Sequence, residues 1–375
     1  MIPRTILSKV KEHITTNKIL IIQGPRKVGK TALIKAALPE GASVMHLDAS
    51  DKKTKAVFEN PTKESIQEIV QGYSFIVIKD AQYFVHLQQF IEEILFGDYP
   101  VNLLLTCSFA PVIDDVLKEA LESHGLIMTL YPCMFQEIAN SSGIVEFDKT
   151  IQQRLVYGNY PQVIEEPQSA EAFLLELIND VIFTHLNPSE RINKSDKLIK
   201  MLQILAFDMG EPISYNDIGF RSGLDNETVE RYIHLLQRAF ILIRIPSFYN
   251  GHKYELKKTH TVYFTDNGIR NAIIRNFNDP ELRNDMDVLW KNWLIAERMK
   301  WNAVNENYCQ YYFWRTHTRQ TMDFIEVRDN KVTAYKSIWD KRKKPKFPAS
   351  FKTAYPDAST HALNRSTYWG FLSKK

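Results

Sequence analysis

Short, largely apolar runs alternate with amphipathic stretches over the first 140 residues. Three such runs occur, at 19–22, 75–78 and 101–106. They have the character of strands that are buried on both faces of a parallel sheet. Helical periodicity fills the segments around them, at 3–16, 30–37, 63–71 and 87–95. Strands that alternate with helices predict βαβ units, so residues 1–140 are expected to form an α/β domain with a parallel sheet.

The pattern changes after this first part. Residues 150–190 have helical periodicity, and three further helix candidates follow, at 196–209, 214–222 and 226–239. Two β-rich stretches come next, at 240–246 and 261–264. Three helices followed by a β-ribbon predict a winged helix, so residues 141–285 are expected to be a helical linker and winged-helix domain. A third domain over 286–375 begins with a helix at 290–302 and continues with strands rich in Tyr, Phe and Val.

Composition narrows the class of protein but names no partner. The chain has 375 residues, of which 44% are hydrophobic and 24% charged, and its net charge is +3. These values are ordinary for a globular protein, so an argument for nucleic acid must come from local patches. Three widely spaced cysteines give neither a disulfide framework nor a metal pair. No apolar run approaches the roughly 20 residues that span a bilayer, so a cytoplasmic protein without a membrane partner is expected.

One glycine-containing segment between the first apolar run and the next helix matches the pattern G-x-x-x-x-G-K-[ST]. It consists of Gly24, Pro25, Arg26, Lys27, Val28, Gly29, Lys30 and Thr31, and Ala32 follows in the helix. The glycines let the backbone N–H groups turn toward phosphates, and the helix adds its positive N-terminal dipole. Lys30 is expected to reach the β- and γ-phosphates, and the Thr31 hydroxyl to bind Mg²⁺. The segment therefore predicts a site for a nucleoside triphosphate, with ATP as the expected ligand.

The sequence lacks one of the two acidic residues that hydrolysis requires. A hydrolysing enzyme of this kind needs one acid for the Mg²⁺ shell and a second to activate water, at the end of an apolar strand. The run 75–78 is followed by Lys79 and then Asp80, so one acid stands where two are expected. A cation at 79 would repel Mg²⁺ unless its flexible stem turns away. Nucleotide binding is expected to survive this departure better than hydrolysis.

Several motifs in order resemble the prokaryotic AAA-type ATPases that carry a C-terminal domain of unknown function, often restriction-endonuclease-like. Beside the phosphate loop they are Lys79–Gln82, Thr106–Ser108, Leu130–Pro132 with Phe135 and Glu137, Tyr157–Pro161, and Tyr263–Gly268. The resemblance implies that Lys79 replaces the Walker B Asp and that Asp80 occupies the catalytic acid position. If the register shifts by one, Asp80 is instead the metal ligand and Ala81 replaces the catalytic acid.

The same resemblance implies a nuclease-like domain that has lost its metal ligands. It places an Asp on one strand, matched by Asp323, and a Glu-x-Lys pair on the next, where Lys336 and Ile338 stand. A further acid is expected near Lys291. One remaining carboxylate cannot assemble a metal site, so a scaffold without nuclease activity is expected.

The C-terminal region is strongly basic. From residue 331 onward eleven Lys and Arg face two acids, Asp340 and Asp357, and a dense run lies at 341–346. Such a run neutralises phosphates and could hold nucleic acid without reading its sequence. The winged-helix segment 226–237 carries acids that repel phosphate, which favours a structural role or a protein partner there.

The sequence thus favours an ATP-binding AAA-type protein with weak or uncertain hydrolysis, acting as a nucleotide-dependent switch. One alternative is a nucleic-acid-binding protein with a degenerate nuclease domain. Another is an active ATPase that relies on Asp80 alone.

Overall fold

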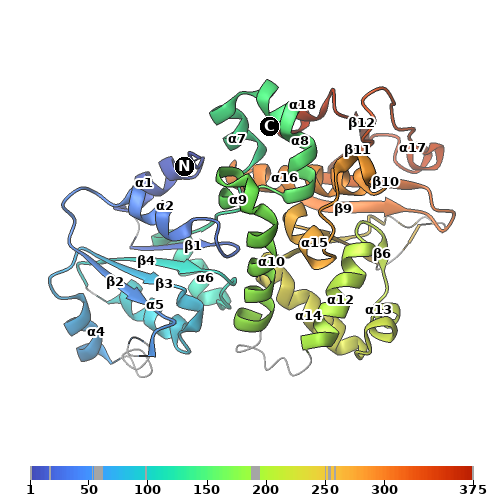
Figure 1. The fold of residues 1–375 in the computed structure, drawn as a ribbon. Helices are drawn as coiled ribbons and strands as arrows, with labels where there is room; N and C mark the ends of the chain where they lie inside the picture. Colours follow the sequence, from blue (N-terminus) through green and yellow to red (C-terminus); the bar gives the residue numbers. More distant parts are fainter. Residues whose placement is uncertain are drawn as a thin grey trace. The chain divides into compact units, whose positions relative to one another are not determined.

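The chain folds into two compact units in the computed structural model (Figure 1). The N-terminal unit comprises residues 2–132 and 238–240, and the C-terminal unit comprises 133–237 and 241–375. The structure describes residues 2–16, 18–52, 54, 62–97, 99–186, 195–249, 251, 255–256 and 259–373. The predicted boundary at 285 lies within the C-terminal unit, and the three-domain division stays a prediction.

The N-terminal unit is built on a five-stranded parallel sheet, as predicted. In the order β2-β3-β4-β1-β5 its strands are Val44–Asp48, Phe75–Lys79, Asn102–Cys107, Ile19–Gln23 and Gly125–Thr129. Its α-helices are α1 Leu7–His13, α2 Lys30–Ala37, α4 Lys63–Val70, α5 Leu87–Phe96 and α6 Asp115–His124, and a 3-10 turn, η1, spans Ala81–Tyr83. The central strands are the predicted ones, whereas the edge strands β2 and β5 were not predicted.

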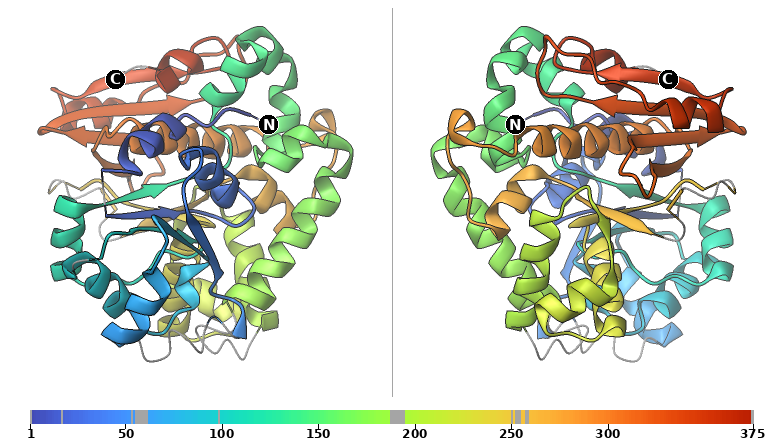
Figure 2. Two further views of the ribbon diagram at one scale, coloured as in Figure 1. Left: turned by 90° about the vertical axis from the view of Figure 1, so that its left-hand side faces the viewer. Right: turned by 90° about the vertical axis from the view of Figure 1, so that its right-hand side faces the viewer.

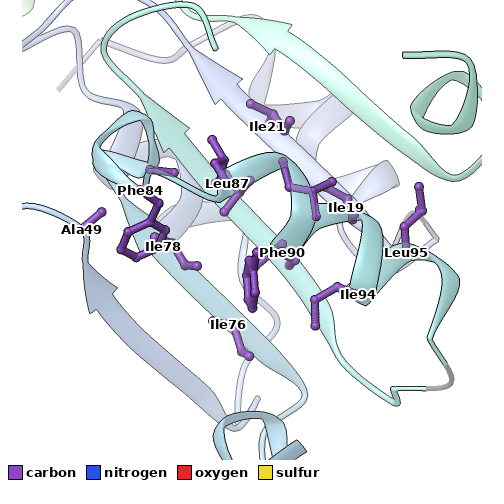
Figure 3. Packing of buried hydrophobic residues seen from close by; sticks show 14 of the residues in the cluster. Ile19, Ile21, Ala49, Ile76, Ile78, Phe84, Leu87, Phe90, Ile94 and Leu95 are labelled. Atoms are coloured by element: carbon purple, nitrogen blue, oxygen red, sulfur yellow. The ribbon is translucent and has the colours of Figure 1, made fainter. Parts of the chain in front are cut away.

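Alternation along the central strands gives this unit its core. Ile19 and Ile21 of β1 point to the same face as Ile76 and Ile78 of β3, and α5 covers that face with Phe90 and other apolar side chains (Figure 3). The intervening residues of β1 are also fully buried, as expected for a strand covered on both faces. Each such large apolar side chain contributes about 1.5–3 kcal/mol by leaving water. The core therefore fixes the carboxyl ends of β1, β3 and β4, where the candidate site lies.

The first part of the C-terminal unit is helical and contains a small sheet. The leading helices are α7 Phe135–Ser142, α8 Ile144–Tyr157, α9 Pro161–Glu165, α10 Ala170–Asp180 and the π-helical turn η3 Val181–Leu186, with a 3-10 turn, η2, at Pro167–Ser169. Then come α12 Ser195–Phe207, β6 Pro212–Ile213, α13 Tyr215–Ser222, α14 Asn226–Arg238, β7 Leu242–Pro246, β8 His260–Phe264, α15 Asn267–Ile273 and a 3-10 turn, η4, at Pro280–Leu282. The three strands form an antiparallel sheet in the order β6-β8-β7. The predicted helices and strands are present where the structure describes the chain, whereas 187–190 of the predicted helical stretch 150–190 lie outside the described residues. The winged-helix assignment itself stays a prediction.

The rest of the C-terminal unit is a mixed sheet with a long helix along one face (Figure 2, right). Its elements are α16 Met286–Val304, β9 Gln310–Arg315, β10 Thr321–Arg328, β11 Lys331–Ser337, α17 Ala349–Ala354, β12 Ser359–Leu363 and α18 Tyr368–Ser373. The sheet order is β12-β11-β10-β9, in which β11 and β12 are parallel and the other pairs antiparallel. Trp314, Ile325 and Phe351 belong to the core of this part. Among the described residues, no helix combines the length and apolar character that crossing a bilayer requires.

Two of the sequence motifs meet in the C-terminal unit. The Asp266 carboxylate accepts hydrogen bonds from the backbone N–H of Asn159 and of Gly268, both at 2.8 Å. Gly158 has φ +74°, and a Cβ there would collide with the Asp266 carboxylate. The glycine is therefore required, because a side chain would remove the space that the carboxylate fills. The motifs 157–161 and 263–268 form a structural joint.

A buried ion pair lies next to this joint. Glu297 of α16 accepts a hydrogen bond from Lys300 Nζ at 2.9 Å, and both side chains are almost fully buried. Glu297 also accepts hydrogen bonds from the backbone N–H of Phe135 at 2.6 Å and from Asn159 Nδ2 at 3.4 Å. Buried charges are stable only when paired and hydrogen-bonded, and Glu297 supplies the acceptor for all three donors.

Candidate nucleotide site and C-terminal basic loop

The loop between β1 and α2 has the backbone geometry that its glycines predict. Gly24 has φ +145°, and a Cβ there would collide with the backbone carbonyl of Leu130. Gly29 has φ +97° and is the N-cap of α2. Lys27 also lies in the left-handed region, at φ +61°, and its side chain is exposed. A strand therefore leads into a tight loop and a helix, which is the context that a phosphate-binding loop requires.

Lys30 is buried within this loop. Its Nζ donates hydrogen bonds to the carbonyl oxygens of Gly24 at 2.8 Å and Pro25 at 2.7 Å. Burial lowers the pKa of Lys30 to about 8, although the Asp80 carboxylate opposes the shift. The ammonium is thus held by backbone dipoles inside the loop, at the position from which the motif's lysine reaches phosphates.

Arg4 supports the loop and was missed by the sequence analysis. Its Nη1 donates to the carbonyl oxygen of Val28 at 2.8 Å, and its Nη2 donates to that of Tyr131. Val28 itself is fully buried. The segment before α1 therefore ties the phosphate loop to the chain just after β5. No local pattern near Arg4 predicts a contact across so many residues.

Asp80 lies at the carboxyl end of β3 and is fixed by the neighbouring strand β4. The Ser108 hydroxyl donates to its Oδ1 at 2.7 Å, and the Asp80 N–H donates to Thr106 Oγ1 at 3.1 Å. Gln82 Nε2 lies 3.4 Å from the same Oδ1, and Arg26 Nη1 lies 4.0 Å from Oδ2. The structure therefore brings together Arg26, Lys30 and Asp80, as well as the polar end of β4.

Lys79 turns away from this site. Its Nζ lies 2.8 Å from Asp48 Oδ2, and Asp48 belongs to β2, on the side of β3 opposite to β4 and β1. Although partial burial alone would raise it, hydrogen bonds from Lys79 and Ser50 hold the pKa of Asp48 below its ordinary value. The repulsion of Mg²⁺ anticipated for a cation at position 79 is therefore avoided.

A single carboxylate remains for a metal ion. Among the described residues there is no group of three or more His, Cys, Asp or Glu side chains that could hold one. A P-loop site needs fewer protein ligands, because Mg²⁺ keeps several waters and binds the phosphates of its nucleotide. The Thr31 hydroxyl and the Asp80 carboxylate are the groups that fit this chemistry.

Asp323, the acid that the resemblance matches to a nuclease, is engaged by protein donors. Lys291 of α16 lies 3.2 Å from Asp323 Oδ1. The Ser337 N–H and hydroxyl donate to Oδ2 at 2.8 and 3.2 Å. The Asp323 carboxylate raises the pKa of Lys291, although burial opposes the shift. Lys336 donates instead to the carbonyl oxygen of Thr321 at 2.8 Å, so an ammonium group stands at the position where the resemblance implies a glutamate.

The basic run 341–346, here called the basic loop, has a defined backbone. Asn364 Nδ2 donates to the carbonyl oxygens of Lys341 at 3.4 Å and Lys343 at 3.1 Å. Asp340 Oδ1 accepts from the Arg342 N–H at 2.9 Å. The lysine and arginine side chains of the loop are exposed. The loop thus displays several cations from a backbone that is fixed by hydrogen bonds.

Two family models match the chain. Residues 16–139 match the model described as AAA domain, and residues 148–280 match a domain of unknown function (DUF8612). An uncharacterized protein of Haemophilus influenzae is 22% identical over an alignment of 297 residues, and the match covers 72% of this chain and 72% of that protein.

Two solved structures with low sequence identity are similar to this chain. One is the Walker-type ATPase PABY2304 of Pyrococcus abyssi, with 12% identity, 73% of this chain and 96% of that chain covered, and a TM-score of 0.46. Another is a STAND protein, PH0952, from Pyrococcus horikoshii, with 14% identity, coverage of 80% and 45%, and a TM-score of 0.31. The AAA domain match and the loop geometry agree, so residues 16–139 resemble an AAA-type P-loop ATPase domain.

Proposed function

We propose that the N-terminal unit binds ATP with Mg²⁺ on the loop from Gly24 to Thr31. The observation that carries this proposal is the Lys30 ammonium, which is buried and donates its hydrogen bonds to the loop carbonyl oxygens of Gly24 and Pro25. Phosphate oxygens are stronger partners for an ammonium group than carbonyl oxygens, because the bond is then charge-assisted on both sides. Thr31 and Asp80 would hold Mg²⁺, which neutralises phosphate charge.

We further propose that hydrolysis is slow and that the bound nucleotide acts as a switch. Asp80 is the one acid at the end of β3, and Ser108 already donates to it. It can serve the metal or activate water, but hydrolysis by P-loop enzymes uses separate groups for these two tasks. A protein that binds ATP tightly and turns it over slowly remains in its ATP state long enough to signal to another part of the chain or to a partner protein.

Binding and turnover should be measured side by side on the full chain. We expect saturable ATP binding with phosphate release well below the roughly 1–10³ per second of ordinary enzymes, and a further loss of release in Asp80→Asn. All six tryptophans lie between residues 290 and 369, so an ATP-dependent change in their fluorescence would report transmission to the C-terminal unit. Release at ordinary enzyme rates would instead favour an active ATPase that relies on Asp80.

A second candidate function is nucleic-acid binding by a nuclease-like scaffold that does not cut. The fixed basic loop favours it, because exposed cations on an ordered backbone can follow a row of phosphates. The helix and strand order from α16 to β12 supports an endonuclease-like assignment, and the order from α12 to β8 supports a winged helix. The Lys291–Asp323 pair supports the absence of cleavage, because an ammonium already neutralises the carboxylate that a metal ion would need.

The basic loop can be tested by its salt dependence. The affinity for a DNA duplex should fall as salt rises, with log K decreasing by about 0.9 per tenfold increase in salt for each phosphate contacted. Changing Lys341, Arg342, Lys343 and Lys344 to Ser should make this slope less steep. Fluorescence anisotropy with labelled duplex at several salt concentrations measures the slope. A matched control changes four exposed lysines elsewhere, namely Lys11, Lys35, Lys118 and Lys149.

Cleavage is a separate readout of the same proposal. No cutting of DNA or RNA is expected with Mg²⁺ or Mn²⁺, because Asp323 lacks a second carboxylate. Metal-dependent cleavage that disappears in Asp323→Ala would contradict the inactive scaffold. A salt slope that the four Ser changes leave untouched would remove the basic loop from the interface.

A further inference from the structure

Arg26 is the second cation of the phosphate loop that faces the site. Its Nη1 lies 4.0 Å from Asp80 Oδ2, and its side chain is 21% exposed. The neighbouring Lys27 is exposed and points into solvent. The motif G-x-x-x-x-G-K-[ST] does not require a particular residue at the position of Arg26, so its placement against Asp80 is a property of this chain.

Arg26 and a metal ion need the same carboxylate. Ser108 and Gln82 approach Asp80 Oδ1, and Arg26 approaches Oδ2. Mg²⁺ at Asp80 would bring a divalent cation next to the guanidinium, and like charges at such distances repel. Because the metal ion bridges the β- and γ-phosphate oxygens, ATP and not ADP would bring Mg²⁺ to Asp80, and the guanidinium must then find another anion within its reach.

The terminal phosphate of ATP is that anion. Lys30, whose position in the motif reaches the β- and γ-phosphates, has a pKa that is lowered chiefly by burial, and it lies close enough to Asp80 and Arg26 for the first to raise that pKa and for the second to lower it. We therefore expect the γ-phosphate to lie near these three side chains. A guanidinium binds phosphate through two parallel N–H groups, a geometry that an ammonium cannot offer.

We infer that Arg26 is a specificity-determining residue. Its guanidinium moves from Asp80 to the γ-phosphate when ATP binds, and it stays beside Asp80 when ADP is bound. The inference rests on the proposed ATP site. It supplies what a nucleotide switch requires, namely a contact that differs between the two nucleotide states. ATP would thereby release the loop from its contact with β3, and ADP would leave that contact in place.

The test compares ATP and ADP binding to the full chain by calorimetry in the presence of Mg²⁺. Arg26→Gln should weaken ATP binding about ten- to a hundredfold, the range that loss of a charge-assisted hydrogen bond gives, while ADP affinity changes by less than about threefold. Lys35→Gln, which removes an exposed cation from α2, is the matched control and should change neither affinity.

A second measurement separates this role from a merely structural one. Without Mg²⁺, Asp80→Asn should strengthen ATP binding because it removes the carboxylate that competes with phosphate for Arg26, and most of the gain should disappear when Arg26→Gln is added. The inference would be overturned if Arg26→Gln weakened ATP and ADP binding equally. It would also be overturned if the effect of Asp80→Asn on ATP affinity were the same with and without Arg26→Gln. Wild-type protein that binds neither nucleotide would instead refute the proposed ATP site itself.

Discussion

Lys30→Met is expected to weaken ATP binding by at least about a hundredfold, because the phosphates lose charge-assisted hydrogen bonds worth about 1.5–3 kcal/mol each. Met retains the length of the stem but carries no charge. The variant should stay folded. Burial disfavours the charged form of Lys30 and lowers its pKa to about 8, so an uncharged side chain of similar length is tolerated at this position. Calorimetric titration with ATP and Mg²⁺ measures the loss.

The control for this prediction is Lys35→Met, in the same helix α2 but exposed to solvent. It changes charge and helix composition in the same way without touching the loop. An unaltered ATP affinity in folded Lys30→Met would show that the loop does not hold phosphate through this side chain.

Glu297→Ala is expected to lower the free energy of unfolding of the C-terminal unit by about 3–5 kcal/mol, the cost of leaving one partner of a buried ion pair uncompensated. Lys300 Nζ would lose its carboxylate, and the Phe135 N–H its acceptor. Such a loss is large beside the total stability of a domain, which is about 5–15 kcal/mol. Urea unfolding followed by tryptophan fluorescence reports this unit alone, because all six tryptophans belong to it.

Glu176→Gln provides the matched control, since Glu176 is an exposed acid within α10. It should change the free energy of unfolding by less than about 0.5 kcal/mol, as is usual for surface positions. A loss below about 1 kcal/mol in Glu297→Ala would mean that water or another side chain satisfies Lys300, and that the buried pair is not what holds the joint.

The sequence predicted the central strands of the N-terminal unit because their apolar runs leave few alternatives. Strands β1, β3 and β4 are covered on both faces, and their side chains need no polar alternation. The edge strand β2 was missed, since Val44–Asp48 mixes apolar residues with His46 and Asp48 and is only partly buried. The strand β5 begins at Gly125 and is similarly exposed. Edge strands carry weaker patterns because one side faces solvent.

The candidate site was predictable where the signal is local and not where it depends on packing. Lys30 and Asp80 follow from a loop motif and from the end of an apolar run. The direction of the Lys79 side chain depends on Asp48, which lies on β2, a strand that the sequence did not predict. The pairing of Asp323 with Lys291 likewise depends on how α16 lies against β10. Contacts of this kind join residues far apart in the chain, and periodicity contains no information about them.

Titration of the wild-type chain with ATP in the presence of Mg²⁺ tests the account most directly. The phosphate loop, the buried Lys30 and the facing Asp80 predict saturable binding of one ATP per chain, with heat that is lost in Lys30→Met. Absence of saturable binding by folded wild-type protein, or equal binding by both proteins, would contradict the assignment of this loop as an ATP site.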